Sequence, residues 1–99
     1  MIALYYVVTY DVATDTREGQ RRLRRVAQAC EGYGQRVQKS VFECVLDEVR
    51  YVELVHRLGD LIRRDEDSVR IYRTQDFTKN SLIVLGKNLG LELGGTWVV

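Results

Sequence analysis

An unbroken apolar run near the N-terminus, ended by a carboxylate, is the feature that most constrains the fold of this chain. Residues 4–10 are leucine, tyrosine, valine and threonine, and Asp11 follows them directly. Such a run predicts a strand that is apolar on both faces. A carboxylate beside it needs a cation, hydrogen-bond donors or water. Two interpretations follow: Asp11 binds a metal ion, or it closes the strand as a turn residue or caps the next helix.

Length and composition predict one compact domain. The chain has 99 residues, 45% of them hydrophobic, so residues 1–99 suffice for a single core but not for two domains. The N-terminal run lacks a basic flank, and no window approaches the roughly 20 apolar residues of a membrane span. We therefore expect a cytoplasmic protein with no membrane association. Cys30 and Cys44 lack metal-ligand spacing and are expected to pack as small hydrophobes.

Helical periodicity follows the first strand. It predicts a helix that is capped by Thr14 or Asp15 and runs to about Glu31. Gly32 is expected to end this helix in a left-handed conformation. The buried stripe, at spacings of three and four residues, consists of Leu23, Val26, Ala27 and Cys30.

The middle of the chain predicts strand and then helix. Residues 35–46 form either one bent strand or two short strands that are broken near Lys39 and Ser40. Asp47 is expected to cap a second helix over about residues 48–64, with His56 on its solvated side. The predicted buried stripe of this helix is Tyr51, Val55, Leu58 and Ile62.

The C-terminal third reads as further strands. Residues 67–73 alternate in polarity, residues 82–85 form a short apolar run, and residues 94–99 end the chain in apolar side chains. The order β-α-β-(β)-α-β predicts an α+β, ferredoxin-like split βαβ sandwich with an additional C-terminal strand. Because two helices cover only one face of such a sheet, we expect a homodimer that buries the other face. The last strand is expected to add to a sheet edge of this chain or of its partner.

Basic residues are concentrated in and after the first helix. From residue 17 to residue 39 there are seven basic and two acidic side chains. All four arginines at 21, 22, 24 and 25 are expected to reach solvent, where they can contact phosphate without reading sequence. The alternative is pairing with surface acids such as Glu18, Glu31 and Glu53. The candidate nucleic-acid-binding residues are Arg17, Arg21, Arg22, Arg24, Arg25, Arg36 and Lys39.

Four stretches together resemble the Cas2 family of CRISPR-associated proteins, small partners of the spacer integrase. They are Tyr10-Asp11-Val12, RRLRRVA at 21–27, GQRVQKSVFE at 34–43 and DSVRIY at 67–72. The resemblance implies a ferredoxin-like homodimer with Asp11 near its axis as a Mg²⁺ ligand, and a role in spacer capture with the integrase. Some family members are metal-dependent nucleases on RNA or double-stranded DNA, whereas others bind DNA without cleaving it.

The resemblance also implies site residues. Tyr10, Asp11, Arg36 and Phe42 match positions implicated in the family's nuclease site, and Arg22 or Arg25 matches an arginine of the first helix. Ser40 is a candidate for orienting water or phosphate. From residue type alone, Tyr10 and Phe42 are equally compatible with core packing.

Three functions therefore remain open. The chain is a weak Mg²⁺-dependent endonuclease, a purely non-catalytic nucleic-acid-binding adaptor, or an RNA-recognition-type domain on the same βαββαβ plan. The third is disfavoured because the signature of RNA-recognition domains on a central strand is missing.

Overall fold

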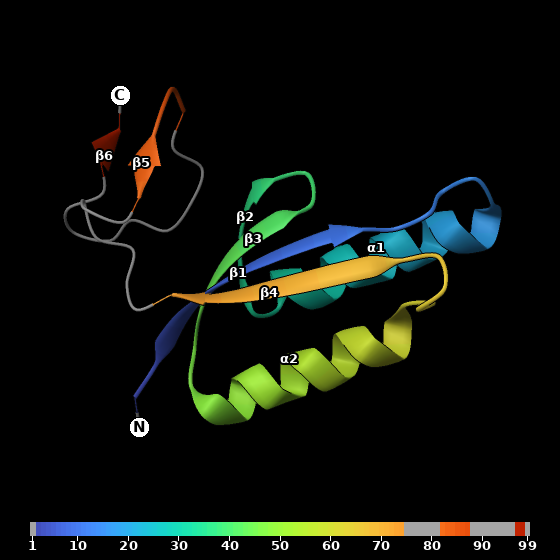
Figure 1. Ribbon diagram of the computed structural model, residues 1–99, viewed down its shortest axis with the longest axis horizontal. Helices are drawn as coiled ribbons and strands as arrows, with labels where there is room; N and C mark the ends of the chain where they lie inside the picture. Colours follow the sequence, from blue (N-terminus) through green and yellow to red (C-terminus); the bar gives the residue numbers. More distant parts are fainter. Residues whose placement is uncertain (1, 75–81, 88–96, 99) are drawn as a thin grey trace.

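The computed structural model describes residues 2–74, 82–87 and 97–98. Strands and helices alternate in the predicted order, and the strands of the main sheet are arranged β2-β3-β1-β4 with all neighbours antiparallel. This arrangement is the predicted ferredoxin-like fold (Figure 1). The elements are β1 (Leu4–Asp11), α1 (Arg17–Glu31), β2 (Gly34–Gln38), β3 (Val41–Leu46), α2 (Glu48–Leu61), β4 (Ser68–Thr74), β5 (Ile83–Val84) and β6 (Trp97–Val98).

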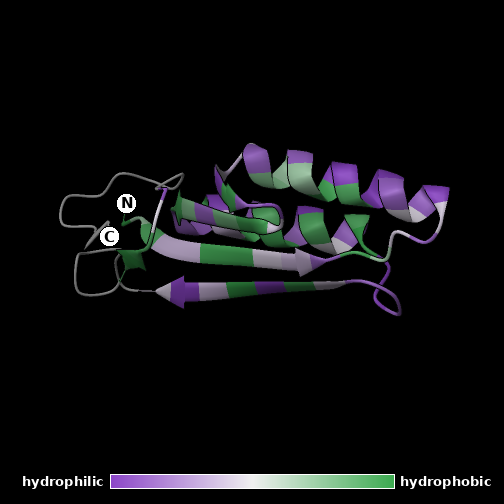
Figure 2. Ribbon diagram, turned by 90° about the horizontal axis from the view of Figure 1, so that it is seen from above, coloured by the Kyte–Doolittle hydropathy of each residue, from purple (hydrophilic) through white to green (hydrophobic). Residues whose placement is uncertain are grey.

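Strand β1 lies in the middle of the sheet and carries apolar side chains on both faces. Tyr6, Val8 and Tyr10 are buried, whereas the alternating Tyr5 and Val7 are half-buried. Both helices lie on the same side of the sheet, with their hydrophilic sides outward (Figure 2). The buried set therefore faces the helices, and the half-buried set lies on the face that no helix covers. We call the latter the open face.

Helix α1 begins at Arg17 and is capped by Thr16, so the predicted cap at Thr14 or Asp15 is wrong. The Thr16 hydroxyl accepts a hydrogen bond from the Gly19 N–H at 3.0 Å. A side chain at Gly19 would collide with the carbonyl of Ala13, so glycine allows the β1–α1 loop to cross the helix closely. Gly32 ends the helix as predicted but stays right-handed (φ −71°), because its N–H still bonds to carbonyls of the last turn.

Residues 34–46 form two strands rather than one. Strands β2 and β3 are a hairpin, and the break lies at Lys39 and Ser40. A side chain at Gly34 would collide with the sulfur and backbone of β3, so the close approach of the two strands requires glycine. A β-bulge between Arg36 and Gln38 shifts the register by one residue.

Helix α2 is capped by Asp47 as predicted, with the Arg50 N–H donating to its carboxylate at 2.9 Å. The helix ends at Leu61, three residues before the predicted end. The buried stripe was partly wrong: Leu54 and Leu58 are buried, whereas Val55 is 39% exposed. Tyr51 stacks on Tyr6 of β1 with ring centroids 4.6 Å apart and so fixes the orientation of the helix. His56, which directly follows Val55, is exposed as expected.

Strand β4 completes the main sheet, with Val69 and Ile71 packed against the core. Among the described residues, β6 pairs in parallel with β5 and not with the edge of the main sheet. The expectation of a C-terminal strand is thus met only at residues 97–98, since residues 94–96 and 99 of the predicted strand lie outside the described part. No helix in the described part of the chain is long and apolar enough to cross a membrane.

Candidate functional site

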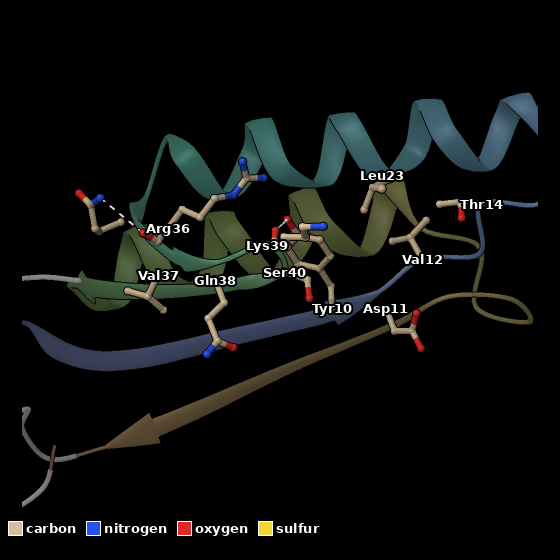
Figure 3. A pocket seen from close by; sticks show the side chains of 11 residues that line it. Tyr10, Asp11, Val12, Thr14, Leu23, Arg36, Val37, Gln38, Lys39 and Ser40 are labelled. Atoms are coloured by element: carbon tan, nitrogen blue, oxygen red, sulfur yellow. Dashed lines mark hydrogen bonds between the residues drawn. The ribbon is translucent and has the colours of Figure 1, made fainter. Parts of the chain in front are cut away.

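A pocket of about 740 Å³ lies where the end of β1, the β2–β3 turn and α1 meet (Figure 3). Four of the five predicted catalytic residues line it, which are Tyr10, Asp11, Arg36 and Ser40, together with the predicted phosphate contact Lys39. The fold therefore brings these predicted residues together in one pocket, although they are up to 30 residues apart in the chain. The remaining lining residues are Val12, Thr14, Leu23, Gln35, Val37 and Gln38.

Asp11 is the last residue of β1 and lies opposite Ser68 of β4. Its side chain is exposed and points away from Arg36 and Lys39 (Figure 3). Within the described residues it forms no hydrogen bond or ion pair. Because it alternates with buried Tyr10, Asp11 shares the open face with Val7 and Tyr5, as the strand pattern predicted. An exposed carboxylate without a protein partner is free to bind a cation or water.

Tyr10, which directly precedes Asp11, anchors the β2–β3 turn to β1. Its hydroxyl donates to the Lys39 carbonyl and its N–H to the Ser40 carbonyl, both at 3.1 Å. The Tyr10 side chain is buried, and its ring stacks on Phe42 with centroids 6.2 Å apart. The position of Ser40 in the pocket is therefore fixed by Tyr10.

Arg36 lies over the Phe42 ring at 5.2 Å and keeps 45% of its side chain exposed. Its hydrogen bond to the Tyr10 hydroxyl raises the pKa of Arg36. Glu31 lies 3.7 Å away, but this exposed ion pair contributes little. The remaining guanidinium N–H groups are available to a phosphate, and the side chain is held in place by the Phe42 ring and the Tyr10 hydroxyl.

Phe42 does not line the pocket, which corrects its prediction as a catalytic residue. It is fully buried, and its ring packs against the Arg36 guanidinium and the Tyr10 ring. The core-packing interpretation of this aromatic residue therefore holds. Its effect on the site acts through the two residues that it supports.

The bulge in β2 adds a residue that sequence reasoning missed. Arg36 is paired with Phe42 on the helix side, and regular alternation would place Gln38 on that same side. Instead Gln38 is paired with Val41, and Figure 3 shows its side chain pointing in the opposite direction from Arg36. The Gln38 amide therefore lines the pocket on the same side as Asp11. The bulge depends on strand pairing, which no local motif revealed.

Helix α1 presents four of the five predicted arginines to solvent, but Arg22 is buried. Its guanidinium donates to Asp67 at 2.8 Å, so the expectation that it faces solvent and binds nucleic acid is wrong. The position lies one turn before Val26 and therefore on the inner side of the helix. Within the described residues, no ion pair joins the four exposed arginines to an acid. The exposed residues are Arg17, Arg21, Arg24 and Arg25.

Other titratable groups do not complete a metal site within one chain. Among the described residues, no three or more His, Cys, Asp or Glu side chains form a group that could hold a metal ion. Burial raises the pKa of the Cys30 thiol to about 12 and that of Cys44 to about 11, so both stay neutral. They are free and buried, as expected of small hydrophobes. Asp11 is therefore the carboxylate of this pocket.

Comparison with known proteins agrees with this fold. The family described as CRISPR associated protein Cas2 matches residues 4–81. The chain is 45% identical over 96 residues to the CRISPR-associated endoribonuclease Cas2 1 of Moorella thermoacetica, covering 97% of this chain and 100% of that protein. It is 44% identical over 87 residues to the CRISPR-associated endonuclease Cas2 of Halalkalibacterium halodurans, covering 88% and 91%.

A solved structure gives the same result. The crystal structure of Streptococcus pyogenes Cas2 at pH 6.5 superposes with a TM-score of 0.66 at 49% identity, covering 70% of this chain and 83% of that one. The superposition extends over most of both chains, and the family match at residues 4–81 includes the pocket residues at 10–11 and 35–40. This chain belongs to the Cas2 family of CRISPR-associated proteins.

Proposed function

We propose that this chain is a CRISPR spacer-acquisition protein that acts in the cytoplasm as a homodimer, binds duplex DNA beside the spacer integrase, and cleaves nucleic acid weakly at Asp11. The observation that carries the proposal is the exposed Asp11 carboxylate on the open face at the end of the central strand, in a pocket that Arg36, Lys39 and Ser40 also line. The names of the relatives, endoribonuclease and endonuclease, support phosphodiester cleavage. RNA is the alternative substrate.

The homodimer follows from the open face. Val45 is 40% exposed and Tyr72 is 48% exposed on this face, beside half-buried Tyr5 and Val7. Burying these side chains against a second copy removes apolar surface from water. In a dimer with a two-fold axis through this face, the two Asp11 carboxylates approach each other.

A magnesium ion suits this donor set. Mg²⁺ is usually held by one or two carboxylates and several waters rather than by a complete protein cage. One Asp11 from each chain would supply two carboxylates, whereas a single chain supplies one. When bound, the ion supplies an activated water and offsets charge on the cleaved phosphate.

The chain's own side chains then have distinct tasks. Arg36 and Lys39 hold phosphate oxygens at the pocket, and the Ser40 hydroxyl orients a water or phosphate. Tyr10 fixes the turn that carries Lys39 and Ser40. On α1, the exposed arginines contact the duplex backbone without reading its sequence. These are Arg17, Arg21, Arg24 and Arg25.

A non-catalytic adaptor is the second candidate function. It is favoured by the single carboxylate in the pocket, since dedicated two-metal nucleases cluster several acidic ligands. In this case Asp11 is dispensable, and the arginines of α1 carry the function together with the integrase.

The first prediction tests cleavage. Purified chain is incubated with single-stranded RNA or duplex DNA, with and without Mg²⁺, beside Asp11→Asn and the matched control Asp15→Asn. We expect Mg²⁺-dependent cleavage by the wild type and by the control, because Asp15 is exposed in the β1–α1 loop and does not line the pocket. Asp11→Asn is expected to lose activity because the neutral amide binds a cation poorly.

Equal activity in the Asp11→Asn variant would identify a contaminating nuclease and leave the adaptor function. Spacer integration separates the same two functions. If it proceeds normally with Asp11→Asn, the scaffold role is independent of cleavage.

A further inference from the structure

A second carboxylate lies behind the pocket and is fully occupied by donors. The Asp67 side chain is 0% exposed. Its Oδ2 accepts from Arg22 Nε at 2.8 Å and from the Arg63 N–H at 2.9 Å. Its Oδ1 accepts from the Ala13 N–H at 3.0 Å and from Arg22 Nη2 at 3.3 Å. One carboxylate thus joins α1, the β1–α1 loop and the α2–β4 turn.

Asp67 is ionised and cannot serve as a second metal ligand. Burial alone would raise its pKa, but the hydrogen bonds from Arg22, Arg63 and Ala13 outweigh burial and lower the pKa of Asp67. Both oxygens already accept two donors each, which leaves no lone pair directed toward the pocket. The role of this carboxylate is therefore internal to the protein.

The same carboxylate fixes the backbone on both sides of Asp11. Ala13, whose N–H it accepts, is two residues after Asp11 on the chain. Ser68, which follows Asp67 directly, is the cross-strand partner of Asp11 in β4. The Ala13 carbonyl packs against Gly19, so the loop is held on its N–H side by Asp67 and on its carbonyl side by α1.

We propose that Asp67, held by Arg22, is a positioning residue that sets the location of the Asp11 carboxylate for divalent-cation binding. This inference rests on the metal-binding part of the proposed function. A site with one carboxylate per chain has no other protein ligand to correct a displacement of Asp11. Outer groups that orient ligands typically change metal affinity about 10–100-fold when they are removed.

The test measures binding of Mn²⁺ alone to the full-length protein by calorimetry, well below the melting temperature. Asp67→Asn keeps the shape of the side chain but replaces one acceptor oxygen with a donor. We expect about tenfold weaker Mn²⁺ binding. Arg22→Lys keeps the positive charge and leaves the bonds of Asp67 to Ala13 and Arg63 in place, but it loses the two-pronged contact of the guanidinium with Asp67. The loss of Mn²⁺ affinity is therefore expected to be smaller in this variant. The matched control Asp65→Asn removes an exposed carboxylate two residues away and should bind as the wild type does.

A lower melting temperature with unchanged Mn²⁺ affinity in both variants would overturn the proposal and leave Asp67 a purely structural residue. Should Asp67→Asn fail to fold, the affinity of Arg22→Lys decides alone. Asp11→Asn is run in parallel. If it binds Mn²⁺ as well as the wild type does, the metal site of the proposed function is wrong; if only the Asp67 and Arg22 variants match the wild type, the positioning role alone is wrong.

Discussion

At the scale of the residue, burial separates the arginine that holds the fold from those that face solvent. Arg22 is 8% exposed and bound to Asp67, whereas Arg21 and Arg25 on the same helix are exposed. Removing a charged pair from water is costly unless further hydrogen bonds complete it. The N–H groups of Ala13 and Arg63 complete this one. Arg22 is thereby committed to the interior and unavailable to nucleic acid.

At the residue scale, we predict that the Asp67 carboxylate makes the free energy of unfolding depend on pH. Because the folded pKa of Asp67 lies below the value of about 3.9 in an unfolded chain, its contribution is fully present at neutral pH. It is lost as the pH falls through the folded pKa. Asp67→Asn should lower the free energy of unfolding at pH 7 by about 1–3 kcal/mol for each backbone donor that is orphaned. Denaturant melts from pH 7 to pH 2 measure the difference.

The gap between wild type and Asp67→Asn should begin to narrow as the pH falls below about 4, because the unfolded carboxylate then takes up a proton while the folded one stays ionised, and it should narrow further until the pH passes the folded pKa. Asp65→Asn, whose carboxylate is exposed, serves as the control and should track the wild type throughout. A gap that stayed constant down to pH 2 would show that the charge of Asp67 does not stabilise the fold.

At the scale of the element, α1 is the basic surface of the chain. Its outer side carries arginines at spacings of three and four residues, so they align along one stripe. In a homodimer this stripe is doubled, and it can follow the phosphates of a duplex. Such contacts release counterions, which makes the affinity strongly dependent on salt.

The element-scale prediction concerns this stripe. With roughly six phosphates neutralised, the log-log slope of duplex affinity against salt should be near roughly −5. Arg21→Glu combined with Arg25→Glu should weaken binding at low salt and reduce the steepness of the slope by about 2 or more. Fluorescence anisotropy across a salt series measures both quantities.

The matched control reverses Arg57 and Arg64, two exposed arginines in and just after α2, to glutamate. It changes the net charge equally and should retain most of the slope. Equal weakening by both double variants would indicate a general charge effect, and unchanged binding by the α1 variant would remove α1 from the interface.

At the scale of the whole molecule, the described helices cover one face of the main sheet and leave its other face open. The helices bury Tyr6, Val8 and Phe42, while Val45 and Tyr72 stay partly exposed on the open face. Exposed apolar surface on a small domain marks an interaction site when it is contiguous. A second copy is the occupant that we propose, because it would also bring two Asp11 carboxylates together.

The whole-molecule prediction is that a charge on the open face dissociates the dimer. Val45→Glu places a carboxylate on this face at a position that is 40% exposed in one chain, so the monomer tolerates it. Sedimentation at micromolar concentration should give a dimer for the wild type and a monomer for Val45→Glu. Val52→Glu on α2 is the control, because Val52 is similarly exposed, at 45%, but lies on the helical side. A monomeric wild type would contradict the two-sided burial argument.

Local pattern was sufficient for the elements up to β4, whereas the family resemblance named most of the predicted site residues that line the pocket. The apolar run of β1, the Asp47 cap and the alternation of β4 each follow from neighbours in the chain, and Asp11 was placed on its face by a period of two. The bulge at Val37 depends on the pairing of β2 with β3, the cap at Thr16 on how the β1–α1 loop crosses α1, and the right-handed conformation of Gly32 on its bonds to the last turn of α1. They were therefore missed or misassigned.

The sequence by itself determined the order of strands and helices, the face on which Asp11 lies and the basic character of α1, because each depends on residue type and short-range periodicity. Only the tertiary structure decided that Arg22 is buried and that Gln38 lines the pocket. It also decided that Phe42 packs beneath Arg36 and Tyr10 and does not line the pocket itself. Arg22 and Asp67 are 45 residues apart. Such pairings form only when the strands have paired and the helices pack on the sheet, because the cost of burying a charge is offset by partners that are distant in the chain.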